Sequence, residues 1–215
     1  MNKTEYINCI IKLVSSLRKD ANGKLVENKF GDVYNKTTFQ PIQPFGMFGD
    51  KYILNQMLRL YVLPKDNYHI SEEAEKLWGS LTSADFRFFR YEETFKCDKL
   101  SKSMNVNTCV GNGKTIVPKN ISPNAKIKFN SIFITEHIVP VSFIIDKLFD
   151  LGSNPNPTYV EDILNAIHVA IILKSENAKL PNKRIITSTN SPDDWWRKVD
   201  NNYYLPNNIK LKPFP

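Results

Sequence analysis

Apolar residues recur every three or four positions in three stretches of the N-terminal half, and this is the spacing of an amphipathic helix. The predicted helices cover residues 4–18, 50–62 and 71–81. Thr4 is a candidate N-cap of the first. Leu63-Pro64 ends the second, because the residue before a proline avoids helical backbone angles. Ser71 precedes two glutamates and is the predicted N-cap of the third.

The C-terminal half has a different pattern. Residues 128–139 are rich in β-branched and aromatic side chains and predict a strand, and residues 141–151 are helical or irregular. The long apolar run of residues 159–173 fits a helix, a strand, or one followed by the other. Residues 98–127 are polar and contain glycines and prolines; this predicts irregular structure and makes them the best candidate domain boundary.

These patterns predict an α+β fold in three parts. Residues 1–125 form a mostly helical region, residues 126–190 a compact α+β unit, and residues 191–215 a C-terminal tail. No internal repeat is visible, and no stretch approaches the roughly 18 apolar residues of a membrane span. The apolar residues near the N-terminus are interrupted by charges and precede no cleavage site, so we expect no signal peptide.

The net charge and the cysteines limit the classes of partner and of structural site that we expect for this chain. The 215-residue chain has a formal net charge of +7, which favours a polyanionic partner such as nucleic acid. Its three cysteines include no C-x-x-C pair, so we expect neither a disulfide framework nor a structural zinc site. The simplest setting for such a chain is reducing and cytoplasmic.

Candidate chemistry is concentrated in two segments. Glu136-His137 ends the predicted strand of residues 128–139, and His168 precedes Asn177 by nine positions across an apolar run. Phosphodiester hydrolysis needs a base that titrates near neutrality, and it needs neutralisation of the developing negative charge. A histidine suits the first requirement. A hard divalent cation held by a few oxygen ligands suits the second.

The segment EHIVPVSF, residues 136–143, resembles the first motif of the H-N-H (ββα-metal) endonucleases. The resemblance covers about residues 128–183, and it implies a ββα-metal hairpin-helix unit embedded in a mostly helical domain. It implies that His137 is the general base and that Glu136 and Asn177 hold Mg²⁺ or Mn²⁺. His168 stands where the family has an asparagine that steadies the loop and orients the base, and Asn165 is an alternative occupant of that position.

Basic residues beside this segment are candidate DNA contacts. The predicted backbone-binding residues are Lys174, Lys179, Lys183 and Arg184, and Arg87 and Arg90 are candidate readers of guanine. Trp195-Trp196 could stack on bases, or at least one of the two rings could pack in the core. Structural interpretations also exist for the candidate site: a buried His137, a core His168, and an Asn177 that caps a helix.

The resulting hypothesis is a sequence-specific, Mg²⁺-dependent endonuclease. Its length fits a type II restriction enzyme that cuts double-stranded DNA as a homodimer, because one ββα-metal unit cuts one strand. The alternatives are a homing or nicking endonuclease, a toxin nuclease, and a DNA-binding protein without catalysis.

Overall fold

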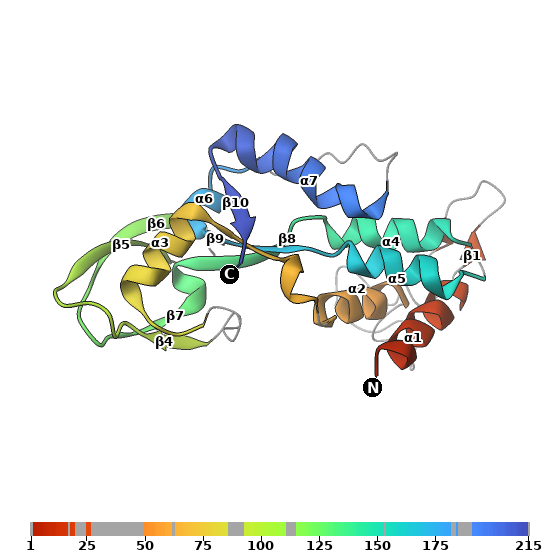
Figure 1. Cartoon of the computed structure of the whole chain (residues 1–215), viewed down its shortest axis with the longest axis horizontal. Helices are drawn as coiled ribbons and strands as arrows, with labels where there is room; N and C mark the ends of the chain where they lie inside the picture. The colour runs from red at the N-terminus through yellow and green to blue at the C-terminus, as the bar shows by residue number, and fades with distance from the viewer. Residues whose placement is uncertain are drawn as a thin grey trace, which may run out of the picture. The chain divides into compact units, whose positions relative to one another are not determined.

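The computed structural model describes residues 2–16, 18–19, 25–26, 50–61, 63–85, 93–110, 115–152, 154–181, 184 and 191–214. The fold is α+β, as predicted, and helices and strands follow one another along the chain (Figure 1). The chain forms two compact units. The first unit comprises Met1–Leu63, Val139–Ile167 and Ser191–Asp193; the second comprises Pro64–Ile138, His168–Asn190 and Asp194–Pro215.

The first unit is built mainly of helices. Its elements are α1 (Lys3–Ser16), β1 (Arg18–Lys19), β2 (Leu25–Val26), α2 (Asp50–Leu60), α4 (Val141–Asp150) and α5 (Pro157–Asn165). The apolar faces of α1, α2, α4 and α5 supply its core, in which Ile10, Leu54 and Leu148 are fully buried. A salt bridge of 2.6 Å between Lys3 and Glu161 joins α1 to α5.

The predicted helices of the N-terminal half are confirmed. The helix expected at residues 4–18 is α1, but its cap is Asn2 and not Thr4. Asn2 Oδ1 accepts from the Glu5 amide at 2.9 Å, and the Asn2 amide donates to Glu5 Oε2 at 2.8 Å. This reciprocal pair satisfies two N–H groups that a helix start would otherwise leave unbonded, and the single Thr4 hydroxyl is not needed.

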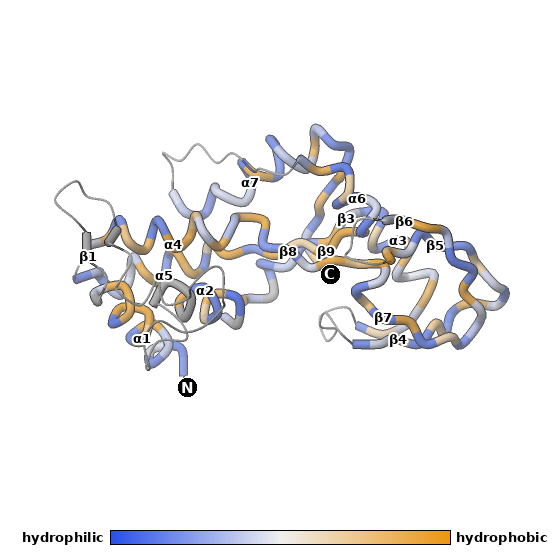
Figure 2. The backbone as a smooth tube through the Cα atoms, turned by 180° about the vertical axis from the view of Figure 1, so that it is seen from behind, coloured by the Kyte–Doolittle hydropathy of each residue, from blue (hydrophilic) through white to orange (hydrophobic). Residues whose placement is uncertain are grey.

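The second unit is organised around a four-stranded sheet in the order β10-β3-β9-β8. The strands are β3 (Tyr68–Ser71), β8 (Phe133–His137), β9 (Val169–Leu173) and β10 (Leu211–Pro213). β9 pairs in parallel with β3 and antiparallel with β8. Buried on both faces, β9 is the hydrophobic centre of the unit, and Figure 2 shows its apolar character. The apolar run of residues 159–173 is therefore the helix α5 followed by the strand β9.

One face of this sheet carries the aromatic core. The helix α3 (Glu72–Leu81) begins where β3 ends, and its N-cap is Ser71 as predicted, with Ser71 Oγ accepting from the Ala74 amide. The Trp78 ring contacts Phe95 and Phe133, with centroids 4.7 and 5.5 Å away. Phe95 belongs to β4 (Thr94–Lys96), which pairs with β7 (Lys126–Lys128), and a short 3-10 turn, η3 (Phe129–Ser131), leads into β8.

The prediction that residues 98–127 are irregular was wrong. They contain β5 (Met104–Val110) and β6 (Thr115–Ile121), which form an antiparallel ribbon with seven paired positions. Asparagines, a lysine and a proline interrupt the apolar side chains of the ribbon, because only the face next to the core is buried. Its sequence therefore resembles a loop.

The predicted three-part division differs from the two units observed. The parallel pairing of β3 with β9 places a strand from the predicted helical region inside the unit that holds the candidate chemistry. The expected tail also joins this unit, through α7 (Trp195–Val199), the π-helical turn η5 (Asp200–Tyr204), the 3-10 turn η6 (Leu205–Asn207) and β10. Among the residues described above, no helix is both long and apolar enough to cross a membrane.

We expect Phe133→Ala to lower the free energy of unfolding by about 3–5 kcal/mol, because it removes a fully buried ring and leaves a cavity among other rings. Urea denaturation followed by circular dichroism measures this change. The control is Val110→Ala, since Val110 is 45% exposed and its loss should change stability by about 0.5 kcal/mol or less. A loss below about 1 kcal/mol for Phe133→Ala would contradict this account of the core.

Candidate functional site at the end of strand β8

The register between β8 and β9 places Glu136 and His137 on opposite faces of the sheet. His137 lies opposite Val169 and Glu136 lies opposite Ala170. Side chains of directly opposed residues share a face of a sheet, and neighbours along a strand point to opposite faces. Glu136 therefore shares a face with His69, which is the β3 partner of Ala170. His137 points to the other face, the one that carries Phe133 and the aromatic core.

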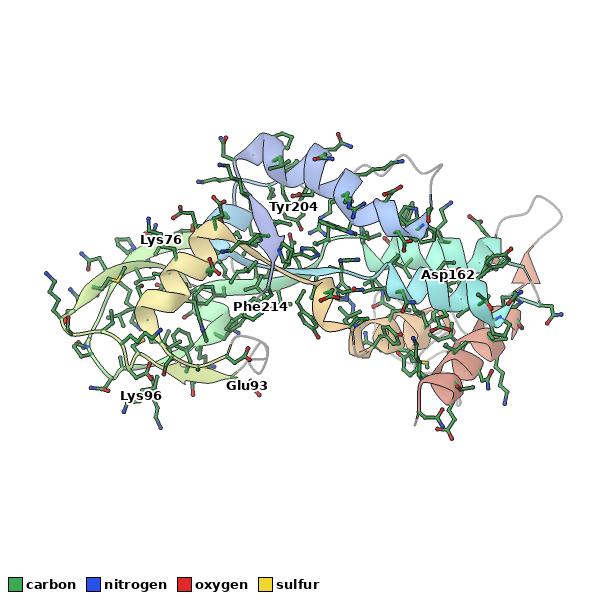
Figure 3. The ribbon with its side chains drawn as sticks, viewed as in Figure 1. Lys76, Glu93, Lys96, Asp162, Tyr204 and Phe214 are labelled. Atoms are coloured by element: carbon green, nitrogen blue, oxygen red, sulfur yellow. The ribbon has the colours of Figure 1, made fainter. Side chains whose placement is uncertain are left out.

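Glu136 is bound by two side chains from the C-terminal part of the chain. Arg184 forms a salt bridge with its Oε2, and the Tyr204 hydroxyl donates to its Oε1. Figure 3 labels Tyr204, which projects from the C-terminal helical segment. The side chains of Arg184 and Glu136 are only 16% and 11% exposed. Both carboxylate oxygens are thus engaged within the chain, at a place that is largely shielded from water.

The electrostatics of this group strengthen the salt bridge. Burial and the neighbouring Glu136 charge raise the pKa of Tyr204, so its hydroxyl remains a donor. Burial lowers the pKa of Arg184, but Tyr204 and Glu136 outweigh that effect and the net shift is upward. The guanidinium also lies 4.9 Å from the centre of the Tyr203 ring, within range of a cation–π contact.

His168 lies on the Glu136 side of the sheet in a buried cluster. Its Nδ1 is hydrogen bonded to Nε2 of His69 at 2.8 Å, and its ring stacks on Trp196 with centroids 5.1 Å apart. Burial lowers the pKa of His69 to about 4; burial, His69 and Arg197 lower the pKa of His168 to about 3. Both rings are therefore neutral at physiological pH. His168 fits the core interpretation that the sequence left open.

Two contacts fix the backbone at His137, one from His168 and one from Arg184. The Ile138 amide donates to the His168 carbonyl at 2.8 Å. Arg184 donates to the His137 carbonyl, and its Nη1 also contacts the Ile138 carbonyl at 3.2 Å. His168 thus steadies the segment after His137 through its backbone, while its ring is engaged elsewhere. His137 itself is partly exposed, unlike the other two histidines of the chain.

Asn177, the other predicted metal ligand, lies in α6, near the end of β8 that is farthest from His137. Leu173 pairs with Phe133, and the Lys174 amide donates to the Ile132 carbonyl at 2.8 Å, so the short helix α6 (Lys174–Asn177) starts there. Phe133 and His137 are four strand steps apart, about 13 Å. The hydrogen bonds of the described residues join Glu136 to Arg184 and Tyr204, and none joins it to Asn177.

The residues as placed do not fit a divalent cation. A hard cation needs carboxylate oxygens that face open space or water. Here the Glu136 carboxylate faces a guanidinium, whose positive charge repels a second cation. Across the described ranges, no group of three or more His, Cys, Asp or Glu side chains is arranged to hold a metal ion.

The remaining predicted residues are distributed as follows. Lys174 and Lys179 lie in and directly after α6, and Lys179 is exposed. Arg184 is turned toward Glu136, so its contact with DNA stays a prediction. Asn165 ends α5. Arg87, Arg90 and Lys183 lie outside the described residues.

Sequence reasoning missed three features of this region: His69, Tyr204 and the ring contact that Trp196 makes with His168. His69 lies 99 positions before His168, and only the parallel pairing of their strands brings the rings together. Tyr204 and the stacking role of Trp196 depend on how the C-terminal segment folds over the sheet. Trp195, by contrast, is buried at 3% exposure, as the core interpretation of the two tryptophans anticipated. No local motif marks any of the three.

Comparison with known proteins identifies no relative: no family model matches the sequence, and neither a curated protein nor a solved structure matches it.

We expect Glu136→Ala and Arg184→Ala each to destabilise the protein by about 2–4 kcal/mol, because each leaves a largely buried charge without its partner. The double variant should lose less than the sum, with a coupling of about 1–3 kcal/mol. Urea denaturation of the four proteins gives this cycle. Strict additivity would show that the salt bridge contributes nothing.

We also expect stability to fall on acidification. The pKa values of His69 and His168 are lowered in the folded state, so the unfolded chain binds more protons between about pH 6.5 and 3. The stabilisation is complete above the unfolded value of 6.5 and is lost as the pH falls toward 4. Asp200 acts in the opposite sense, because burial raises its pKa to about 6.

The measurement is the free energy of unfolding at several pH values for wild type and His168→Gln. Between pH 7 and 4.5 the wild type should lose on the order of 2 kcal/mol more than the variant. Val110→Ala should follow the wild-type curve. Parallel curves for wild type and His168→Gln would contradict a buried, neutral pair.

Proposed function

We propose that this chain is a DNA endonuclease that hydrolyses phosphodiester bonds at the end of β8, with His137 as the general base. The observation that carries the proposal is the difference between the three histidines. His69 and His168 are buried, hydrogen bonded to each other and neutral, so neither can exchange protons with a solvent-borne substrate. His137 is partly exposed at the end of a strand and has the access that a base needs.

The local topology supports the same class. β8 and β9 are antiparallel neighbours, and the four-residue helix α6 follows β9, so two paired strands and a helix lie together as in a ββα unit, although α4 and α5 separate the two strands along the chain. His137 closes the first strand, as the resemblance of EHIVPVSF implies. Arg184 and the His168 carbonyl fix the backbone on both sides of the peptide that follows it. A base held this way can meet a water with little reorganisation.

In the proposed reaction, His137 takes a proton from a water as the water oxygen attacks phosphorus. The bond from phosphorus to the 3′ oxygen breaks, and that oxygen is protonated by solvent. The products are a 5′ phosphate and a 3′ hydroxyl. Arg184 acts as a positioning residue, because it holds the His137 carbonyl. Magnesium dependence belongs to the class, but the Glu136 side chain as placed is committed to Arg184, so no step of the reaction is assigned to a metal here.

We propose double-stranded DNA as the substrate and a homodimer as the active form. The net charge of +7 favours a polyanion. About 150 residues lie outside the segment that resembles the H-N-H unit, more than a non-specific nuclease needs, and recognition of a short palindrome by two protomers would use them.

A second function is favoured by one observation. The closed Glu136–Arg184 salt bridge suits a DNA-binding protein that has the fold of a nuclease unit without its metal chemistry. Such a protein would retain the basic charge and would cut nothing.

Plasmid DNA incubated with the purified protein and Mg²⁺ or Mn²⁺, and in parallel with EDTA, separates the two functions. The nuclease proposal predicts discrete bands on a gel, and the comparison with EDTA shows whether cleavage requires a cation. His137→Ala should reduce the cleavage rate by about 10²–10⁴-fold, because it removes the base. Its affinity for DNA in EDTA should stay within about twofold of wild type, since a base is not a phosphate anchor.

The control is Asn202→Ala, an exposed polar residue outside the site, which should cleave at the wild-type rate. Parallel loss of binding and cleavage in His137→Ala would mean that His137 is structural. DNA that is bound but left intact with every cation would favour the second function.

A further inference from the structure

The ribbon of β5 and β6 presents an outer face of amide side chains. Asn105 and Asn120 are directly opposed, and Asn107 lies opposite Pro118. Directly opposed residues and second neighbours along a strand share one face, so these four residues form a single surface. All four are exposed. Uncharged amide groups, which carry both a donor and an acceptor, are among the groups that read base edges.

The ribbon is anchored to the second unit by its other face. Val106 and Ile121 are 4% and 2% exposed and belong to the same core as Trp78 and Phe133. Thr108 Oγ1 donates to the Val117 carbonyl at 3.3 Å and ties the two strands together. The outer amides are therefore held on a fixed support. An element that distinguishes one base from another requires such a support, because loosely held side chains lose discrimination.

The strands next to the ribbon carry an excess of positive charge. Residues 93–128 contain only two acidic residues, Glu93 and Asp98, but seven lysines: Lys96, Lys99, Lys102, Lys114, Lys119, Lys126 and Lys128. This excess of five positive charges gives the segment a net attraction for a polyanion. Lys96 and Lys126, two of the seven lysines, are both exposed.

Two of these lysines lie directly opposite each other on paired strands. Lys96 on β4 and Lys126 on β7 are cross-strand partners, and both are exposed. Like charges in this position destabilise a strand pair. The unliganded protein thus bears a small cost that a bound polyanion would remove. Figure 3 labels Lys96, whose side chain extends outward from the second unit.

We propose that the β5–β6 ribbon is a DNA-reading element that enters the major groove. Asn105, Asn107 and Asn120 face base edges, and the neighbouring lysines bind the phosphate backbone. This inference rests on the proposed DNA function, and it names the part of the chain that recognises sequence. The major groove, about 12 Å wide, admits a two-stranded ribbon whose strands are about 4.8 Å apart. Asparagine pairs with adenine in that groove, so the recognised site should contain A·T pairs.

A concave surface adjoins the amide face. A cavity of about 330 Å³ lies along β5 and α3, and Asn105 and Asn107 are among its lining residues together with Lys76 and Ser80. These side chains add further hydrogen-bond donors beside the ribbon. The lining also includes Glu73, Leu173 and Ser175, but neither Glu136 nor His137, so recognition and cleavage can be tested separately.

The test is a binding selection in EDTA, with 30-base-pair duplexes that carry a randomised 12-base-pair centre. Bound duplexes are recovered and sequenced. The wild type should enrich a motif that includes A·T pairs. Asn105→Ala/Asn107→Ala/Asn120→Ala should bind the unselected pool within about threefold of wild type and lose enrichment at those positions. Asn202→Ala, the matched control, should give the wild-type motif.

The lysines are tested with the unselected pool at several salt concentrations. Lys96→Ala/Lys126→Ala should weaken binding to all sequences alike and reduce the slope of log K against log salt by about two. Lys12→Ala, an exposed lysine of α1, should leave the slope unchanged. Without DNA, the double variant should melt at the wild-type temperature or about 1–2 °C higher, because the opposed charges are gone.

The outcomes separate this inference from the proposed function. If the asparagine variant selects the same motif as wild type, or the lysine variant keeps the wild-type salt slope, the ribbon does not read DNA, whether or not the protein cleaves. If both arms succeed and DNA stays intact with Mg²⁺, the ribbon is a DNA reader and the nuclease proposal fails. Absence of any binding by the wild type in EDTA overturns the inference.

Discussion

The second unit depends on one arrangement: β9 lies between β3, to which it is parallel, and β8, to which it is antiparallel. This pairing determines which side chains share a face. It places Glu136 and His69 on one side and His137 on the other. It also joins strands that lie about a hundred positions apart, so the buried histidine pair cannot form unless the sheet is complete. A shift of one residue in the β8 register would exchange the faces of Glu136 and His137 and would expose Phe133.

Glu136, Arg184 and Tyr204 show how a largely buried charge is stabilised in this unit. The carboxylate, the guanidinium and the phenol form a largely buried set in which each polar group has a partner. These contacts stabilise one geometry over others, because any member that lost its partner would leave a buried charge or hydroxyl without a hydrogen bond. The same physics explains why the carboxylate is a poor cation ligand in this arrangement. A metal would have to compete with a cation that is covalently part of the chain.

Much of the fold was predictable from the sequence where burial is one-sided and periodic. The helices α1, α2 and α3 follow their apolar spacing, and Ser71 marks the start of α3. The β5–β6 ribbon was not predicted, because the alternation of apolar and polar residues in Met104–Asn107 is short and Pro118 interrupts the pattern of the partner strand. In the candidate site, the strand that ends at His137 was expected from its composition. The partners of Glu136 were not, since Arg184 and Tyr204 reach it from 48 and 68 positions away. Long-range pairing leaves no signal in a single local pattern.

The two compact units are not consecutive along the chain. The first is made of three separate stretches of sequence, and so is the second, so the backbone passes from one to the other five times. No single cut therefore separates one unit from the other. A fragment that ends at residue 193 holds every segment of the first unit but lacks α7 and β10 of the second, and a fragment that starts at residue 64 lacks α1 and α2 of the first. Either loss exposes core that the missing elements cover. Exchange of either unit for a unit of another protein would therefore require several coordinated insertions instead of one.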